Sequence, residues 1–415
     1  MAHQAASRAG LLALLWTTLF LFFPLPPTLS GLELLWRASI EVDAANPRDF
    51  VDGLLAFCIG VTVTITFIRP WRLINLTSLL LLLSALGIVL LSLYGADYRE
   101  PLMAAALWSF FFAATLLKPD DRCVILIVWI CILGMQMLVA LTAYFLSYNQ
   151  FITPGFGQRA SGLFSNPNAL YPWSVIAFFV FLEFARSLPA NKIRTVVFWG
   201  AIGSFTVLVL TFSRAGWLGL AMGLLTVVMQ PFKHNHSVTY RAICLAIALC
   251  LICGAATVRT QGAIVSPNND GSTAGRLRVW RHAFHLWSEH PWFGNGYKAF
   301  RWPSDGSAVA GEPKNLVLHV ALQSGFVGVL LHGLYFGSVL VLARKIALHS
   351  HSAWYDAVIA RATFLSVVAL LVAGLLDTPV FGPLYRVPPT ITLLTFTGLL
   401  LAAGGPSFKV EKRLG

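Results

Sequence analysis

The chain has 415 residues, of which 57% are hydrophobic and only 11% charged, and its formal net charge is +12. Its mean hydropathy is +0.74. No soluble domain of this length could bury so much apolar surface in one core, and long uncharged runs are typical of helices that cross a bilayer. The composition therefore excludes a soluble protein and predicts an all-α polytopic membrane protein, with residues 1–415 forming a single membrane domain.

Apolar runs predict about twelve transmembrane helices in chain order. They lie near residues 10–30, 50–68, 73–94, 101–117, 123–148, 169–186, 195–212, 215–231, 240–257, 316–343, 359–377 and 388–404. A cleaved signal peptide is the alternative for the first run, but that run is long and has no small-residue cleavage box, which favours a retained span. The one large break, residues 258–315, is predicted to be a loop subdomain between the ninth and tenth spans.

Lysine and arginine in the short connections predict the orientation of the chain. If the N-terminus lies in the cytoplasm, the connections on that side contain most of these cations, and an even number of spans returns the C-terminus there. The 258–315 loop then lies on the outer face, since long loops do not follow the charge rule. The six cysteines lie within or at the edges of apolar runs and show no metal-ligand spacing, so we expect no metal site.

Cationic side chains gather in the predicted outer loop, among them Arg276 and Arg278. Anionic lipids of the inner leaflet do not explain this excess, because they attract cations to the cytoplasmic side. A bound phosphate would explain it, since the guanidinium fork forms paired, charge-assisted hydrogen bonds with phosphate oxygens. A solvated basic surface is the alternative.

Arg214 lies in a very short interruption between two apolar runs, beside Ser213 and Gly216, which favour a tight turn. An arginine held at membrane depth is a candidate for function, although a side chain that merely reaches the headgroups is the simpler explanation.

Two other segments of the outer face contain polar or aromatic side chains that suit a sugar. In residues 149–173, Arg159, Asn166 and Asn168 could face a headgroup or a glycan, but Asn166-Pro167-Asn168 is also a typical turn and helix cap. In residues 287–300, aromatic residues alternate with polar ones, a mixture that suits either sugar stacking or an interfacial helix.

Four segments, taken together and in order, resemble a known family. They are the arginine–glycine loop followed by NPN (159–168), SRAGWLGL (213–220), GRLRVWRHAFHLWSEHPWFGNGY (275–297) and KNLVLHVALQSGFVG (314–328). This set is similar to the O-antigen ligase (WaaL-type) and O-antigen polymerase superfamily of bacterial inner-membrane glycosyltransferases. The resemblance implies a GT-C-like arrangement of helices, with a large periplasmic loop between spans nine and ten.

The resemblance to ligases implies a metal-independent, inverting transfer of O-antigen polysaccharide from undecaprenyl diphosphate to a sugar hydroxyl of lipid A–core. The active site would be periplasmic and both termini cytoplasmic, with membrane lipids as neighbours and neither a cofactor nor a nucleic-acid partner. Matching positions assign Arg214 and Arg276 to the diphosphate, and Arg159 and Arg278 are further candidates. Candidates for contact with donor or acceptor are Asn166, Asn168 and Asn315.

The chain departs from the family at its proposed base. The segment matching KNLVLHVALQSG usually begins with His-Asn, and counting back from Ser324-Gly325 places Lys314 at the histidine position. An imidazole titrates at about pH 6.5 and accepts a proton at neutral pH, whereas an amine is normally already protonated. Three interpretations stay open: Lys314 is deprotonated by its surroundings and acts as the base, it is another diphosphate clamp, or the chain is a weakened variant, natural or engineered.

His319 is the alternative base. On a helix it would lie about 140° around the axis and about 7.5 Å along it from Lys314, so a buried histidine bonded to a neighbouring helix is the competing interpretation. Three histidines of the loop are further candidates, each of which could equally be a surface residue: His282, His285 and His290.

Other functions remain open at this point. Within the superfamily, the alternatives are an O-antigen or exopolysaccharide polymerase and a protein O-glycosyltransferase. A flippase or transporter for an anionic lipid belongs to a different class and would favour symmetry-related halves and charges at the bilayer midplane. No internal repeat is evident in the sequence, and the candidate cations cluster at one predicted face.

Overall fold

The computed structural model describes residues 76–92, 108, 110–115, 117–147, 151–153, 157–162, 167–229, 238–265, 273–296, 313–349, 353–380 and 387–404. The spans predicted near 10–30 and 50–68, part of the span predicted near 101–117, and Asn166 lie outside these ranges.

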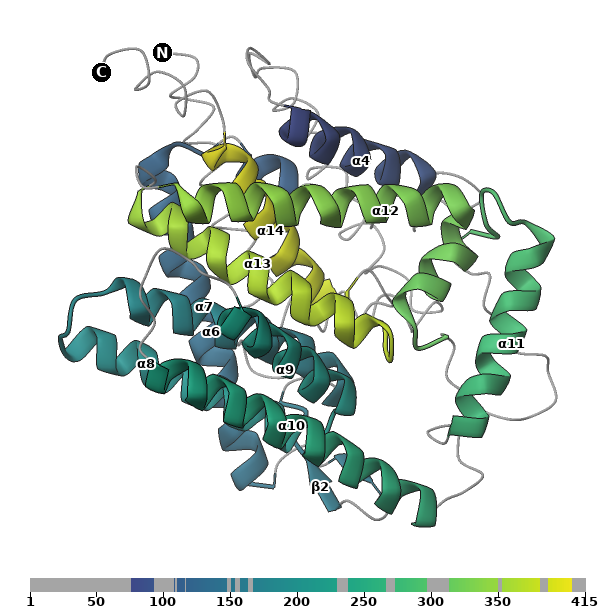
Figure 1. Cartoon of the computed structure of the whole chain (residues 1–415), viewed down its shortest axis with the longest axis horizontal. Helices are drawn as coiled ribbons and strands as arrows, with labels where there is room; N and C mark the ends of the chain where they lie inside the picture. The colour runs from purple at the N-terminus through teal and green to yellow at the C-terminus, as the bar shows by residue number, and fades with distance from the viewer. Residues whose placement is uncertain are drawn as a thin grey trace, which may run out of the picture. The chain divides into compact units, whose positions relative to one another are not determined.

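The described chain is almost entirely helical (Figure 1). Its helices are α4 (Leu76–Ser92), α6 (Pro119–Phe145), α7 (Pro167–Ser187), α8 (Lys192–Leu210), α9 (Arg214–Met229), α10 (Val238–Val265), α11 (Thr273–Glu289), α12 (Leu316–Leu348), α13 (Trp354–Gly374) and α14 (Val387–Ala403). All of these except α11 coincide with predicted spans. Strands β1 (Phe151–Thr153) and β2 (Gly157–Arg159) pair antiparallel, with Phe151 opposite Arg159.

Six of the described helices are long and apolar enough to cross a membrane: α6, α7, α8, α12, α13 and residues 238–257 of α10. Three shorter apolar helices are α4, α9 and residues 389–403 of α14. The chain is therefore a helical membrane protein. The count of twelve spans and the placement of residues 258–315 on the outer face remain predictions.

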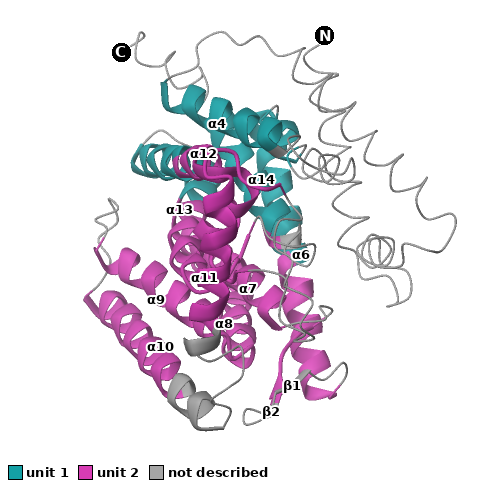
Figure 2. Ribbon diagram, turned by 90° about the vertical axis from the view of Figure 1, so that its right-hand side faces the viewer, with its two compact units in different colours: residues 1–132, 334–360, 390–415 teal, residues 133–333, 361–389 magenta. Residues whose placement is uncertain are grey.

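Two compact units divide the chain, shown in teal and magenta in Figure 2. Unit 1 comprises residues 1–132, 334–360 and 390–415, and unit 2 comprises residues 133–333 and 361–389. In unit 1, both carboxylate oxygens of the buried Asp356 accept hydrogen bonds from Arg122, each at 2.9 Å. Because each charge is neutralised by a partner with matching hydrogen-bond geometry, this ion pair can be buried.

Unit 2 is built around α7, in which nearly every residue from Pro167 to Ala185 is buried. Helices α8 and α9 pack against it through glycines that leave room for its aromatic rings. A Cβ atom at Gly200 of α8 would lie 2.7 Å from Phe181, and one at Gly223 of α9 would lie 2.2 Å from Phe179. The glycines thus allow close helix packing, as is common between membrane helices.

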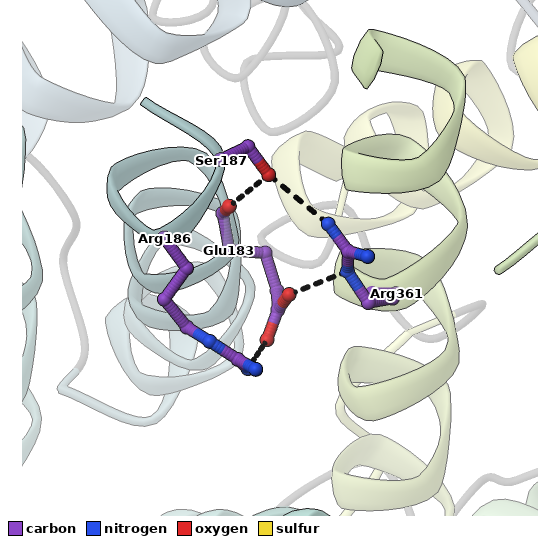
Figure 3. Close-up of polar contacts among 4 residues, drawn as sticks. All are labelled: Glu183, Arg186, Ser187 and Arg361. Carbon is purple, nitrogen blue, oxygen red and sulfur yellow. Dashed lines mark hydrogen bonds and ion pairs between the residues drawn. The ribbon is translucent and has the colours of Figure 1, made fainter. Parts of the chain in front are cut away.

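A buried ion cluster joins α7 to α13 within unit 2 (Figure 3). Glu183 is fully buried, and its Oε2 accepts a hydrogen bond from Arg361 Nε at 2.7 Å, while its Oε1 is bonded by Arg186. Arg361 Nη2 donates to Ser187 Oγ at 3.0 Å. The Arg186 guanidinium also lies over the ring of Tyr240 in α10, 5.2 Å from its centroid. Three helices therefore depend on one carboxylate.

Replacing Glu183 by glutamine should destabilise unit 2, because two part-buried guanidinium groups would lose their buried counter-charge. Removing one partner of a buried pair typically costs about 3–5 kcal/mol. We expect a clearly lower unfolding temperature of the Glu183→Gln protein in detergent, measured by intrinsic fluorescence.

The same substitution at Glu289, which is half exposed on α11, is the matched control and should leave the unfolding temperature nearly unchanged. The double variant Glu183→Gln with Arg361→Gln should lose less stability than the two single losses combined. Equal unfolding temperatures for the Glu183→Gln and Glu289→Gln proteins would contradict the role assigned to the cluster.

Candidate functional site

The turn between α8 and α9 presents Arg214 at a helix N-terminus. Phe212 takes a left-handed backbone conformation (φ 48°), which reverses the chain in a few residues. Ser213 caps α9, because its Oγ accepts a hydrogen bond from the Gly216 amide at 3.4 Å and its carbonyl accepts one from the Trp217 amide at 2.9 Å. The tight turn predicted from Ser213 and Gly216 is present, and Arg214 is the first residue of α9.

Arg159 is held against the end of α8. Its Nε donates to the Thr211 carbonyl at 2.7 Å and its Nη2 to Asn168 Oδ1 at 3.3 Å, while the Ala160 amide donates to the Leu210 carbonyl at 2.8 Å. Burial and the nearby Arg214 guanidinium lower the pKa of Arg159 to about 10, and the Asp377 carboxylate opposes this shift. Arg159 therefore keeps its charge at neutral pH, beside a second arginine.

The turn that follows α13 receives two side chains from elsewhere in the sequence. Arg276 Nη1, from the first turns of α11, donates to the Leu376 carbonyl at 3.0 Å. Asn315 Nδ2 donates to the Leu375 carbonyl, also at 3.0 Å. The next residue of the turn is Asp377, whose side chain is buried. Arg276 and Asn315 are therefore bonded to the two residues that precede Asp377, whose carboxylate also acts on Arg159.

Lys314 is placed by the residues on either side of it. Trp280 Nε1 of α11 donates to the Pro313 carbonyl at 2.9 Å, and Asn315 caps α12 by accepting a hydrogen bond from the Leu318 amide at 3.0 Å. Between them, Lys314 takes a left-handed backbone conformation (φ 46°) and is half-buried. His319 lies about one turn further along α12, where it is buried.

α12 is broken at Gly325, where φ is 64° and ψ is −163°, a backbone conformation open to glycine alone. Residues 291–296 fill the break through four backbone hydrogen bonds. The amides of Asn295 and Gly296 donate to the carbonyls of Leu322 and Gln323, and those of Phe326 and Val327 donate to Pro291 and Trp292, all at 2.7–3.1 Å. This segment therefore replaces the helical hydrogen bonds that the break removes.

Sequence comparison relates part of the chain to a known family. Residues 199–333 match the family model described as O-antigen ligase. Over this part, about a third of its length, the chain is similar to the O-antigen ligase family. Members of that family are glycosyltransferase-like ligases and polymerases of lipid-linked polysaccharides, which supports an enzymatic function for this chain. No curated protein matches the chain. The match contains Arg214, Arg276, Lys314 and the break at Gly325.

The structure brings together most of the residues predicted for the site. Within unit 2, Arg159 is hydrogen-bonded to Asn168 and lies within the electrostatic influence of Arg214 and Asp377, and Arg276 is hydrogen-bonded to the residue before Asp377. Arg278 is exposed on the side of α11 away from Arg276, and Asn166 lies outside the described residues. Within the described ranges, the structure has no group of three His, Cys, Asp or Glu residues able to hold a metal ion. The roles of these residues remain predictions.

The sequence-based prediction omits Asp377. Its one available signal is a carboxylate directly after the apolar run of α13, in a predicted outer connection that has few other acids. Asp377 matters for the site because the residue before it, Leu376, accepts a hydrogen bond from Arg276 through its carbonyl. The sequence alone does not reveal that contact.

Substituting Gly325 by alanine should disrupt the attachment of residues 291–296 to α12. A Cβ atom there would lie 2.2 Å from the carbonyl atoms of Trp292, and the backbone conformation excludes side chains. We expect a loss of at least about 2 kcal/mol in stability. Thermal unfolding in detergent, with protein yield, measures it.

Gly333 in the same helix provides the control, because nothing lies within 4 Å of a Cβ atom added there. Gly333→Ala should be neutral or gain up to about 1 kcal/mol through helix propensity. If Gly325→Ala and Gly333→Ala unfold at the same temperature, the break at Gly325 is not required for stability.

Proposed function

We propose that the chain is an O-antigen ligase that transfers O-antigen polysaccharide from undecaprenyl diphosphate to a sugar hydroxyl of lipid A–core, with inversion and without a metal. The observation that supports this most is the pair formed by Arg159 and Arg214. Each guanidinium is near enough to disfavour the charge of the other, and a bound anion would relieve that repulsion.

The surroundings of Arg214 also favour an anion. The N-terminus of a helix has unpaired amide groups and a partial positive charge, so a cation there is unfavourable unless an anion joins it. Arg214 is the first residue of α9, and Arg276 approaches the same group of residues through the turn after α13. Three arginines and one carboxylate, Asp377, leave an excess of positive charge that suits a diphosphate.

In the proposed reaction, the acceptor hydroxyl oxygen attacks the anomeric carbon of the donor sugar from the face opposite the diphosphate. A new carbon–oxygen bond forms as the bond to the diphosphate oxygen breaks, and the diphosphate leaves with the electron pair. Arg159, Arg214 and Arg276 stabilise the charge that grows on the leaving group, the role a divalent cation has in other transferases. The hydroxyl proton passes to a base beside the acceptor.

We propose Lys314 as that base, with His319 as the alternative. Lys314 stands where the family places a histidine, and its left-handed backbone is fixed by the contacts of Pro313 and Asn315. His319 is buried about one turn further into α12. The third possibility, Lys314 as another clamp on the diphosphate, differs in its pH dependence.

The orientation that we propose places this site at the periplasmic face of the inner membrane, with both termini in the cytoplasm. The ends of α8 and α13 and the starts of α9 and α12 then meet on that face, as the alternation of spans requires. A polymerase would use the same donor with a second lipid-linked glycan as acceptor, so only the acceptor separates the two activities. A flippase is disfavoured because the candidate cations gather at helix ends instead of along a path through the membrane.

Alanine substitution of Arg214 or Arg276 should abolish transfer by purified protein in vesicles that contain undecaprenyl-diphosphate-linked O-antigen and lipid A–core. Losing a preorganised donor to a transition-state oxyanion typically costs a factor of about 100–1000 in rate. Product is followed by the mobility of the modified lipid on gels.

The matched control is Arg281→Ala, an exposed arginine on the same helix as Arg276, which should retain transfer. Replacing the acceptor by a second lipid-linked glycan tests the polymerase alternative. If parent protein extends that glycan and leaves lipid A–core unmodified, the chain is a polymerase; full activity of the Arg214 and Arg276 variants would overturn the site.

Exchanging Lys314 for histidine should move the pH dependence of transfer to lower pH. A base acts only when deprotonated, so the rate rises with pH through the titration of the base, and an imidazole releases its proton well below an amine. We expect the Lys314→His rate to level off near neutral pH while the parent rate still rises in alkaline buffer. Identical pH profiles would mean that position 314 is not the base.

A further inference from the structure

An exposed aromatic patch lies at the break of α12. It consists of Trp292, Phe293 and Phe326, which are 64%, 50% and 52% exposed. The rings of Trp292 and Phe326 meet edge to face, with centroids 6.0 Å apart. Two exposed rings in contact, with a third on the residue next to Trp292, would be unfavourable in water, so their surroundings require an explanation.

The patch cannot move independently of α12. The four backbone hydrogen bonds between residues 291–296 and residues 322–327 attach it on both sides of Gly325. Gly294 tightens this attachment, since a Cβ atom there would lie 2.6 Å from the amide nitrogens of Ser324 and Gly325. The depth of the patch in the membrane is therefore the depth of the break.

The length of α12 indicates where that break lies. After Gly325 the helix continues to Leu348, about 34 Å at 1.5 Å per residue, which already exceeds a hydrocarbon core of about 30 Å. The preceding residues, 316–324, are not needed to cross it. If residues 326–348 form the membrane span, the break lies at the border between the hydrocarbon and the headgroups.

We infer that the aromatic patch is an anchor that inserts into the lipid interface at the end of α12 nearest the candidate site. Tryptophan and other aromatic rings favour this zone, where apolar faces meet acyl chains and polar edges meet headgroups. This inference depends on the chain being a membrane protein and is independent of the ligase reaction.

The neighbouring helix α11 supports the same placement. In Figure 1 it runs at a steep angle to α9 and α10 of unit 2. Leu277 and Phe284, which are seven residues apart, lie on one edge of its exposed face, and His285 and Glu289 lie on the other. A helix with such edges lies in the plane of the interface, with its apolar edge toward the acyl chains.

The anchor has a consequence for the site. If the hydrocarbon begins at Gly325, the first turns of α12, together with Lys314 and Asn315, lie among the headgroups or beyond them. A lipid-linked substrate presents its diphosphate at that level, with its chain in the bilayer. The aromatic patch would therefore set the height at which the arginines meet that diphosphate.

Fluorescence quenching in vesicles tests the anchor. The full chain, with its six native cysteines replaced by serine, receives a single cysteine at Phe293, Phe326 or His285, labelled with a polarity-sensitive fluorophore. Each protein is reconstituted into phosphatidylethanolamine–phosphatidylglycerol vesicles. It is then exposed to iodide in the water or to lipids that bear a nitroxide near the headgroup.

At positions 293 and 326 we expect a blue-shifted emission, quenching by the nitroxide lipid and loss of quenching by iodide. At position 285, the control, iodide should quench. Iodide quenching at all three positions would overturn the anchor, and protection of 293 and 326 from both quenchers would mean that protein, such as a second copy, covers the patch. If the Phe293→Cys protein does not fold, the Phe326→Cys protein still decides the test, because its substitution lies outside residues 291–296.

Discussion

The end of a membrane helix has carbonyl groups with no partner within the helix, and a low-dielectric surrounding makes them costly to leave unbonded. In this chain, that requirement places the candidate site. The carbonyl of Thr211, after α8, accepts from Arg159, and those of Leu375 and Leu376, after α13, accept from Asn315 and Arg276. The same bonds that satisfy these helix ends bring the cationic side chains together.

The part-buried arginines described in unit 2 have two different kinds of partner. In the cluster around Glu183, each carboxylate oxygen bonds one arginine, so the charges serve the packing of α7, α10 and α13. At the candidate site, Arg159 is bonded to neutral oxygens, and its pKa is lowered by burial and by Arg214. A bound diphosphate would be the stronger partner there, since the bonds that now hold Arg159 fix its position without neutralising its charge.

Hydropathy predicts the helices well because membrane helices are selected by length and apolarity alone, and the starts of α7, α9, α12 and α14 lie within two residues of the predicted positions. The tight turn at Arg214 also follows from local residues. The role of Asp377 and the attachment of residues 291–296 cannot be predicted in this way. Both depend on backbone groups that tertiary packing brings into contact. Gly294 and Gly325 are visible in the sequence, but their complementarity appears only when the two segments lie side by side.

Lys314, which stands where the related family has a histidine, has an unusual backbone conformation. A positive φ at a residue with a Cβ atom costs about 1 kcal/mol, and glycine or asparagine would adopt that conformation more readily. Two hydrogen bonds offset this cost: Trp280 donates to the carbonyl of Pro313, before Lys314, and Asn315 caps α12 after it. A lysine at such a position contributes nothing to backbone stability that a glycine would not. The constrained backbone therefore fixes where the side chain of Lys314 begins, directly before the cap of α12.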